Sequence, residues 1–175
     1  GLDIDSLLVE AKNGLAGKIS NDNVVADVNT FIMDRYRAIY QDQNIPADTV
    51  MAVQAAIKAN GEHNPHDFDL RIQAVQSFRA LPEAAALAAA NKRVQNILAK
   101  QGGDIAVTDV DAKLFNSAAE TNLFEQISTL TSTVAGLTQN REYTSALTKL
   151  AALKDSVDTF FEDVMVMDED MAIRT

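Results

Sequence analysis

The chain has 175 residues, of which 47% are hydrophobic and 23% charged, and its formal net charge is −10. This length and balance are typical of one folded domain rather than of a disordered segment. The sequence contains no cysteine, which excludes disulfide bonds and thiolate zinc sites, and no apolar run of about eighteen residues, so no membrane-spanning helix is predicted. We expect a cytoplasmic protein.

Helical patterns separated by Gly, Asn and Pro fill the first half of the chain. We expect a short amphipathic helix over residues 2–12 and a long helix over residues 22–43. Pro46 starts the next helix, and the one after it runs over residues 67–81. The long helix carries an apolar stripe that we expect to face the core, made of Val24, Val28, Phe31, Ile32, Tyr36 and Ile39.

The next predicted helix ends at Lys100. Pro82 and Glu83 suit its first turn, six alanines follow between residues 84 and 90, and Gly102 stops it. Its apolar residues recur at helical spacing, so we expect them to form one buried face: Leu87, Ala90, Val94, Ile97 and Leu98.

The last third of the chain continues the helical pattern after a break. Residues 102–109 contain several β-branched residues, and we interpret them as a loop. Helices are then predicted over residues 111–139 and 142–153, and a final one carries Val157 to Met165. The fold class is therefore predicted to be all-α, a single bundle of about eight helices over residues 1–175.

Charge is unevenly distributed along the chain. Residues 71–100 carry a net charge of +4, whereas residues 1–70 carry −6 and residues 101–175 carry −8. Binding of a nucleic acid depends on cations at the contact surface rather than on the net charge of the whole chain, because affinity comes from the phosphates neutralised there. The segment from 71 to 100 is therefore the part of the sequence that permits such a partner.

Four segments in the same order carry a family resemblance. They read FIMDRYRAIYQDQ at 31–43, FDLRIQAVQSFR at 68–79, LAAANKRVQNIL at 87–98 and VDTFFEDVMVM at 157–167. Together they resemble the C-terminal, DALR-like anticodon-binding region of the beta subunit of bacterial glycyl-tRNA synthetase. In that family a further helix follows the last segment, whereas this chain stops at Arg174-Thr175.

The resemblance implies a non-catalytic, helical tRNA-binding module of an ATP-dependent glycine–tRNA ligase. Its ligand would be the anticodon limb of glycine tRNA, and its protein partners would be the rest of the beta subunit and the alpha subunit, which makes the glycyl adenylate. No cofactor is expected in this domain, because ATP and Mg are used elsewhere in the parent assembly. Neither DNA nor a membrane is expected as a partner. The chain lacks an initiator Met, and we interpret residues 1–175 as a fragment of a longer subunit.

Four candidate tRNA-binding residues lie on the predicted helix that ends at Lys100. Lys92 and Lys100 carry flexible ammonium groups that suit phosphates. Arg93 and Asn96 either contact phosphates or an unstacked base, or hold a neighbouring helix end or loop by hydrogen bonds.

Four further candidates lie outside that helix. Arg71 and Arg79 either extend the basic strip or belong to a solvated face. Tyr143, beside Arg141 at a helix start, is a candidate for stacking on a base. The complete set of candidate tRNA-binding residues is Arg71, Arg79, Lys92, Arg93, Asn96, Lys100, Arg141 and Tyr143.

Other motifs have ordinary interpretations. His63 and His66 flank Pro65, and a polar loop explains them better than a metal site, because the proline disturbs ligand spacing and no cysteine assists. No Ser-His-Asp set or paired carboxylates can be argued from the residues, so no catalytic residue is predicted. The acidic end, from Glu162 to Asp170, either repels RNA, docks on a basic patch or is simply solvated.

An alternative function remains open at this point. A helical module that assembles subunits or domains, without RNA contact, is compatible with the net charge of −10 and the acidic flanks.

Overall fold

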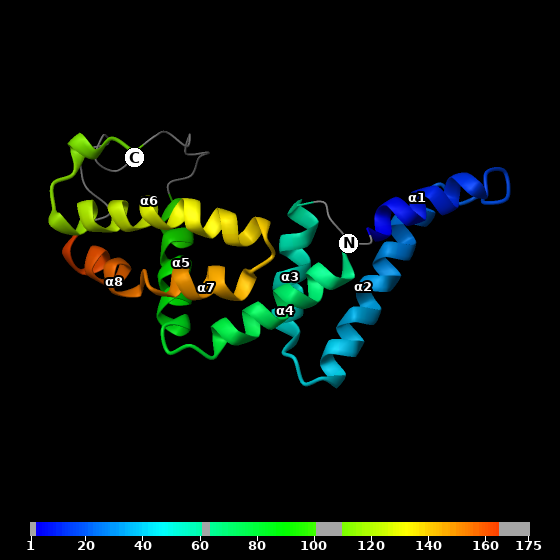
Figure 1. The fold of residues 1–175 in the computed structure, drawn as a ribbon, viewed down its shortest axis with the longest axis horizontal. Helices are drawn as coiled ribbons and strands as arrows, with labels where there is room; N and C mark the ends of the chain where they lie inside the picture. Colours follow the sequence, from blue (N-terminus) through cyan, green and yellow to red (C-terminus); the bar gives the residue numbers. More distant parts are fainter. Residues whose placement is uncertain (1–2, 61–63, 101–109, 165–175) are drawn as a thin grey trace. The chain divides into compact units, whose positions relative to one another are not determined.

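The structure is a computed structural model that describes residues 3–60, 64–100 and 110–164 (Figure 1). Within these ranges the chain forms eight α-helices and one short 3-10 helix, and no strand. The predicted all-α class is confirmed. The chain divides into two compact units, Gly1–Ser77 (unit 1) and Phe78–Thr175 (unit 2). That residues 1–175 act as one domain stays a prediction.

Unit 1 contains α1 (Ile4–Gly14), α2 (Val24–Asp42), α3 (Ala47–Asn60) and α4 (Pro65–Arg79), whose last two residues belong to unit 2. Helix α2 packs against both α1 and α3. The predicted break between the second and third helices is confirmed at Asn44, which takes a left-handed φ of 61° that asparagine tolerates better than most residues.

The core of unit 1 is built around Phe68. Its ring lies 5.2 Å from the ring of Tyr36 and 5.5 Å from that of Tyr40, measured between centroids. The Tyr40 hydroxyl donates a 3.0 Å hydrogen bond to Oδ1 of Asp69. Burial and this bond raise the pKa of Tyr40. The buried cluster consists of Tyr40, Ile45, Val50, Val53, Ile57, Phe68 and Ile72.

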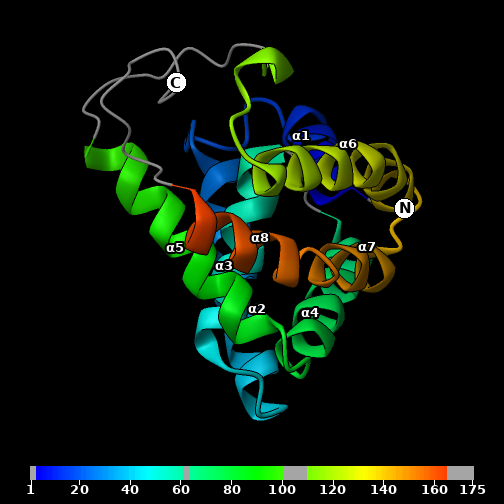
Figure 2. The same ribbon diagram turned by 90° about the vertical axis from the view of Figure 1, so that its left-hand side faces the viewer.

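Unit 2 contains α5 (Ala84–Lys100), the 3-10 helix η1 (Ala112–Leu114), α6 (Ala118–Gln139), α7 (Tyr143–Ala151) and α8 (Lys154–Asp163). Helix α6 packs against α7 and α8, and α8 also packs against α5 (Figure 2). The buried residues of these helices are small, which lets the helices approach closely; they are Ala84, Ala119, Ala146, Ala151 and Ser156.

The helix predicted to begin at residue 111 begins at Ala118 instead, which corrects the prediction. Ser117 and Glu120 form a capping box: Oγ of Ser117 accepts a 3.2 Å bond from the Glu120 N–H, and Oε2 of Glu120 accepts a 2.7 Å bond from the Ser117 N–H. These bonds satisfy N–H groups of the first turn and fix where the helix starts. Upstream of Ser117, residues 112–114 form η1, with Asp111 as its N-cap.

Several apolar residues that we expected to be buried are exposed. On α2, Phe31 is 57% exposed and Ile39 is also exposed, because the side of the helix that meets the core carries Met33, Tyr36 and Tyr40. The guanidinium of Arg35 lies 5.0 Å above the Phe31 ring and covers part of it.

On α5 the predicted apolar face is only half-buried at Leu87, Ala90 and Ile97, and the prediction is wrong at two further residues. Val94 and Leu98 are exposed, the latter by 47%. Helix α8 has 10 residues and α5 has 17, so this neighbour covers only part of α5. Among the described helices, none combines the length and apolar content needed to cross a membrane.

Candidate nucleic-acid interface

Helix α5 carries a polar face with positive charge. Lys92, Asn96 and Lys100 are spaced four residues apart, so they project from one side of the helix and span about 12 Å along its axis. All three are exposed. The helix contains no acidic residue, so its face has no negative charge of its own.

These side chains are available to a ligand. Within residues 3–60, 64–100 and 110–164, the side chains of Lys92, Asn96 and Lys100 form no hydrogen bond or ion pair. Exposed ammonium groups without a carboxylate partner are suited to phosphate oxygens, because they need not first break an ion pair. The helix or loop that Asn96 was expected to hold is not found in this part of the chain.

Arg93 has a specific neighbour. Its Cζ lies 4.2 Å from the centroid of the Phe161 ring on α8, so the guanidinium rests on the ring face. Phe161 is half-buried, and its ring meets that of Phe160 edge to face at 5.5 Å. Arg93 was expected either to contact RNA or to hold a neighbouring element by hydrogen bonds. The structure shows a contact with the neighbouring helix α8, made with the Phe161 ring rather than by a hydrogen bond. The side chain of Arg93 is nevertheless exposed.

Arg141 and Tyr143 occupy the turn between α6 and α7. Arg141 takes a left-handed φ of 62°, and its N–H donates a 3.0 Å bond to the carbonyl of Thr138. Tyr143 is the first residue of α7, and both side chains are half-buried. Figures 1 and 2 both show this turn away from the Lys100 end of α5, so the structure does not bring the two groups of candidates together.

Comparison with known proteins shows a family match over the part of the chain that carries this surface. Residues 87–175, more than half of the chain, match the DALR anticodon binding domain family. The chain belongs to this family. The match contains α5 from Leu87 onward and all of unit 2 that follows it. It therefore includes six of the candidates, namely Lys92, Arg93, Asn96, Lys100, Arg141 and Tyr143.

Curated relatives extend the similarity of this DALR protein to almost its whole length. The glycine–tRNA ligase beta subunit of Coxiella burnetii (strain Dugway 5J108-111) is 47% identical over 169 residues, which cover 97% of this chain and 24% of the relative. That of Aeromonas salmonicida (strain A449) is 47% identical over 173 residues, 99% of this chain and 24% of the relative. The chain thus spans about a quarter of the length of these relatives. The family resemblance inferred from the four segments is confirmed.

Arg71 lies outside the DALR match and inside unit 1, where it forms an ion pair. Its Nε lies 2.7 Å from Oδ2 of Asp67, whose side chain is 4% exposed, whereas that of Arg71 is 22% exposed. The Asp67 N–H donates to Oδ1 of Asn64 at 3.2 Å. Arg71 therefore neutralises a buried carboxylate. Arg79 is exposed at the end of α4, where it also takes part in an interaction.

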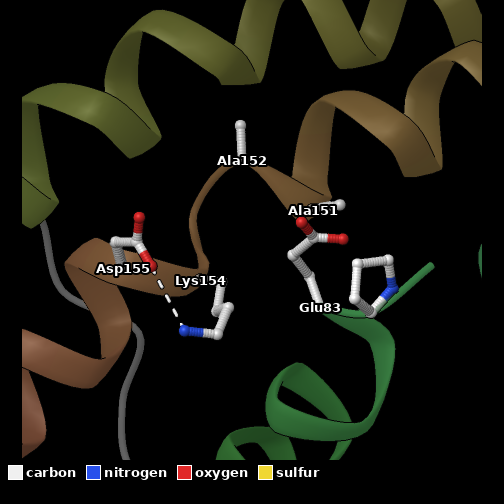
Figure 3. Close-up of a pocket in the computed structure, with 6 residues that line it drawn as sticks. Glu83, Ala151, Ala152, Lys154 and Asp155 are labelled. Carbon is white, nitrogen blue, oxygen red and sulfur yellow. Dashed lines mark hydrogen bonds and ion pairs between the residues drawn. The ribbon is translucent and has the colours of Figure 1, made fainter.

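A cavity in unit 2 of the DALR protein was not predicted from the sequence. It measures about 260 Å³ and lies where the start of α5 meets the α7–α8 turn (Figure 3). Nζ of Lys154 donates to Oδ2 of Asp158 at 2.9 Å and to Oδ1 of Asp155 at 3.2 Å, and these two bonds raise the pKa of Lys154. With Glu83 also at the wall, carboxylates outnumber the ammonium group, so the cavity disfavours phosphate. It is lined by Pro82, Glu83, Ala151, Ala152, Lys154 and Asp155.

Metal binding has little support in the described part of the chain. There, no group of three His, Asp or Glu residues is placed to hold an ion. The His66 N–H donates a 3.0 Å bond to Oδ1 of Asn64, as expected for a polar loop that enters a helix. His63, the tract 102–109 and the acidic run 168–170 lie outside the described residues.

Proposed function

We propose that this chain is a non-catalytic tRNA-binding module of a cytoplasmic glycine–tRNA ligase, and that it positions glycine tRNA by its anticodon limb. The observation that carries the proposal is the exposed basic face of α5, within the span that matches the anticodon-binding family. The names of the curated relatives supply the amino acid, glycine. The adenylate chemistry, with ATP and Mg, would take place in other parts of the assembly, among them an alpha subunit.

The mechanism is positional. Lys92 and Lys100 hold phosphates as point charges at either end of the face, and Asn96, between them, offers both a hydrogen-bond donor and an acceptor to a base edge. Glu162 and Asp163 on α8 are exposed and repel the RNA backbone, so RNA is directed to the lysine-bearing side of α5. Contacts of this kind raise affinity and orient the tRNA without any bond being made or broken.

A second function, docking to other parts of the synthetase without RNA contact, is favoured by the exposed apolar residues Val94 and Leu98 on the same helix. Exposed apolar area of this kind more often marks a protein contact than an RNA backbone contact. Binding of glycine tRNA distinguishes the two functions, because only the first requires contact with RNA.

The experiment is binding of labelled glycine tRNA to the wild-type chain and to the double variant Lys92→Ala, Lys100→Ala over a series of salt concentrations. Each phosphate contact on single-stranded RNA contributes a slope of about −0.7 to log K against log salt, so the double variant should lose about 1.4 from the slope. The matched control is Lys113→Ala, Lys149→Ala, which removes two exposed lysines of unit 2 outside α5 and should keep the slope.

The outcomes separate the alternatives. Absence of binding by the wild type at low salt would overturn the RNA function in favour of docking. Equal losses in the double variant and its control would show that binding is a general charge effect, and α5 would then not be the contact surface.

A further inference from the structure

The contact between Arg93 and Phe161 leaves one side of a flat cation open. The centroid of the Phe161 ring lies 4.2 Å from Cζ of Arg93, yet Arg93 as a whole is exposed. Within the described residues no carboxylate pairs with Arg93. The Phe161 ring therefore occupies one side of the cation, and the rest of the exposed guanidinium can meet a ligand.

The surroundings favour a neutral, flat ligand over a phosphate. Glu162 and Asp163 follow Phe161 directly in the sequence, and both are exposed. The negative charge that these two residues give to α8 disfavours a phosphate at Arg93 more than it disfavours an uncharged base. A guanidinium is also weakly hydrated and stacks readily on flat rings, and unpaired bases of RNA are recognised in this way.

Neighbouring residues on α5 complete the arrangement. Asn96 is three residues from Arg93 and so lies on an adjoining part of the helix surface, and Lys92 and Lys100 lie on either side along the axis. A nucleotide whose base stacks on Arg93 can then place its backbone near a lysine and an edge of its base near the amide.

We propose that Arg93 stacks on an unpaired nucleobase of the bound RNA, and that Phe161 is a positioning residue that holds the guanidinium plane for it. This inference rests on the proposed function, since it names the part of the RNA that the α5 surface contacts. It differs from a phosphate contact in a way that can be measured, because stacking needs the plane of the guanidinium and a phosphate contact needs only its charge.

The test compares variants that keep the charge. Arg93→Lys keeps the charge and loses the plane, and Phe161→Leu removes the ring under the plane. A stacked base contributes about 1–3 kcal/mol to the binding free energy, and about 1.4 kcal/mol corresponds to a tenfold change in affinity. Each variant should therefore weaken binding of glycine tRNA about tenfold while leaving the salt slope unchanged. A duplex RNA without unpaired bases should bind wild type and variants alike.

The chain supplies a matched control. Arg35 lies over the exposed ring of Phe31 at 5.0 Å on α2, in unit 1, which makes the same kind of contact outside the proposed RNA surface. Arg35→Lys and Phe31→Leu should leave tRNA binding unchanged. We expect the variants to fold, because Arg35, Arg93 and Phe31 are exposed and Phe161 is only half-buried, and circular dichroism checks this for each of them.

The results distinguish failure of the inference from failure of the proposed function. If the wild type binds and Arg93→Lys binds equally well, Arg93 is a phosphate contact or no contact, and the stacking is overturned while the RNA function stands. If Arg93→Lys weakens binding but Phe161→Leu does not, the positioning role of Phe161 is overturned. If the wild type does not bind glycine tRNA at low salt, the proposed function fails and the inference fails with it.

Discussion

Replacing Arg71 by Met should destabilise unit 1 without weakening RNA binding. The substitution keeps the apolar stem of the side chain and removes the charged donor that lies 2.7 Å from Asp67. A hydrogen bond to a charged group contributes about 1.5–3 kcal/mol, and more when a buried charge is left behind. Because the Arg71 side chain is 22% exposed, water can partly replace it. We therefore expect the free energy of unfolding to fall by about 2 kcal/mol.

The assay is urea unfolding followed by circular dichroism, with Arg37→Met as the matched control. Arg37 pairs with Asp34 at 3.2 Å, but both side chains are more than half exposed, at 55% and 61%, so that pair should contribute less than about 1 kcal/mol. Binding of glycine tRNA is measured below the unfolding transition. A folded Arg71→Met protein that unfolds at the wild-type urea concentration, yet binds tRNA less tightly, would refute the reasoning and return Arg71 to the RNA surface.

Two other predictions concern stability. Burial and the bond to Asp69 raise the pKa of Tyr40, so the protonated hydroxyl contributes its full stability below the usual tyrosine pKa of about 10, and this stability is lost as the pH rises through the higher pKa of the folded state. Tyr40→Phe should reduce the alkaline loss of stability, and at pH 7 it should lower the free energy of unfolding by about 1 kcal/mol because the hydrogen bond is missing. Urea unfolding at neutral and at alkaline pH measures both effects. Ser117→Ala should lower the free energy of unfolding by about 1 kcal/mol, because the α6 cap is lost. Gly136→Ala, on the same helix, should raise it by about 0.5–1 kcal/mol, because the added methyl group enters open space. Equal changes in the two variants would contradict the role of the cap.

The sequence predicts the helices well where residues punctuate the chain. Asn44 and Pro46 mark the end of α2 and the start of α3, because one tolerates a left-handed backbone and the other suits a first turn. The Ser-Ala-Ala-Glu pattern at 117–120 also marks the start of α6. The apolar spacing continues upstream of this cap, so the predicted helix began too early.

Burial and the site could be predicted only in part. The pair of Asp67 with Arg71 has the four-residue spacing of a helical ion pair, but that the carboxylate is buried depends on the core around it. The contact between Arg93 and Phe161 joins helices distant in the sequence, so no local pattern reveals it. Phe31 fits the apolar stripe of α2 as well as Tyr36 does, yet Phe31 is exposed and Tyr36 packs against the core, a difference that only the packed neighbours decide.

The alanine contacts of unit 2 limit how that unit can change in evolution. A core of large side chains, such as the one around Phe68 in unit 1, can exchange one apolar residue for another of similar volume. Alanine at a helix contact has no such substitute, because larger residues push the helices apart and glycine weakens them. Substitutions in unit 2 should therefore accumulate on its surface, where a different RNA preference can arise while the helices keep their packing.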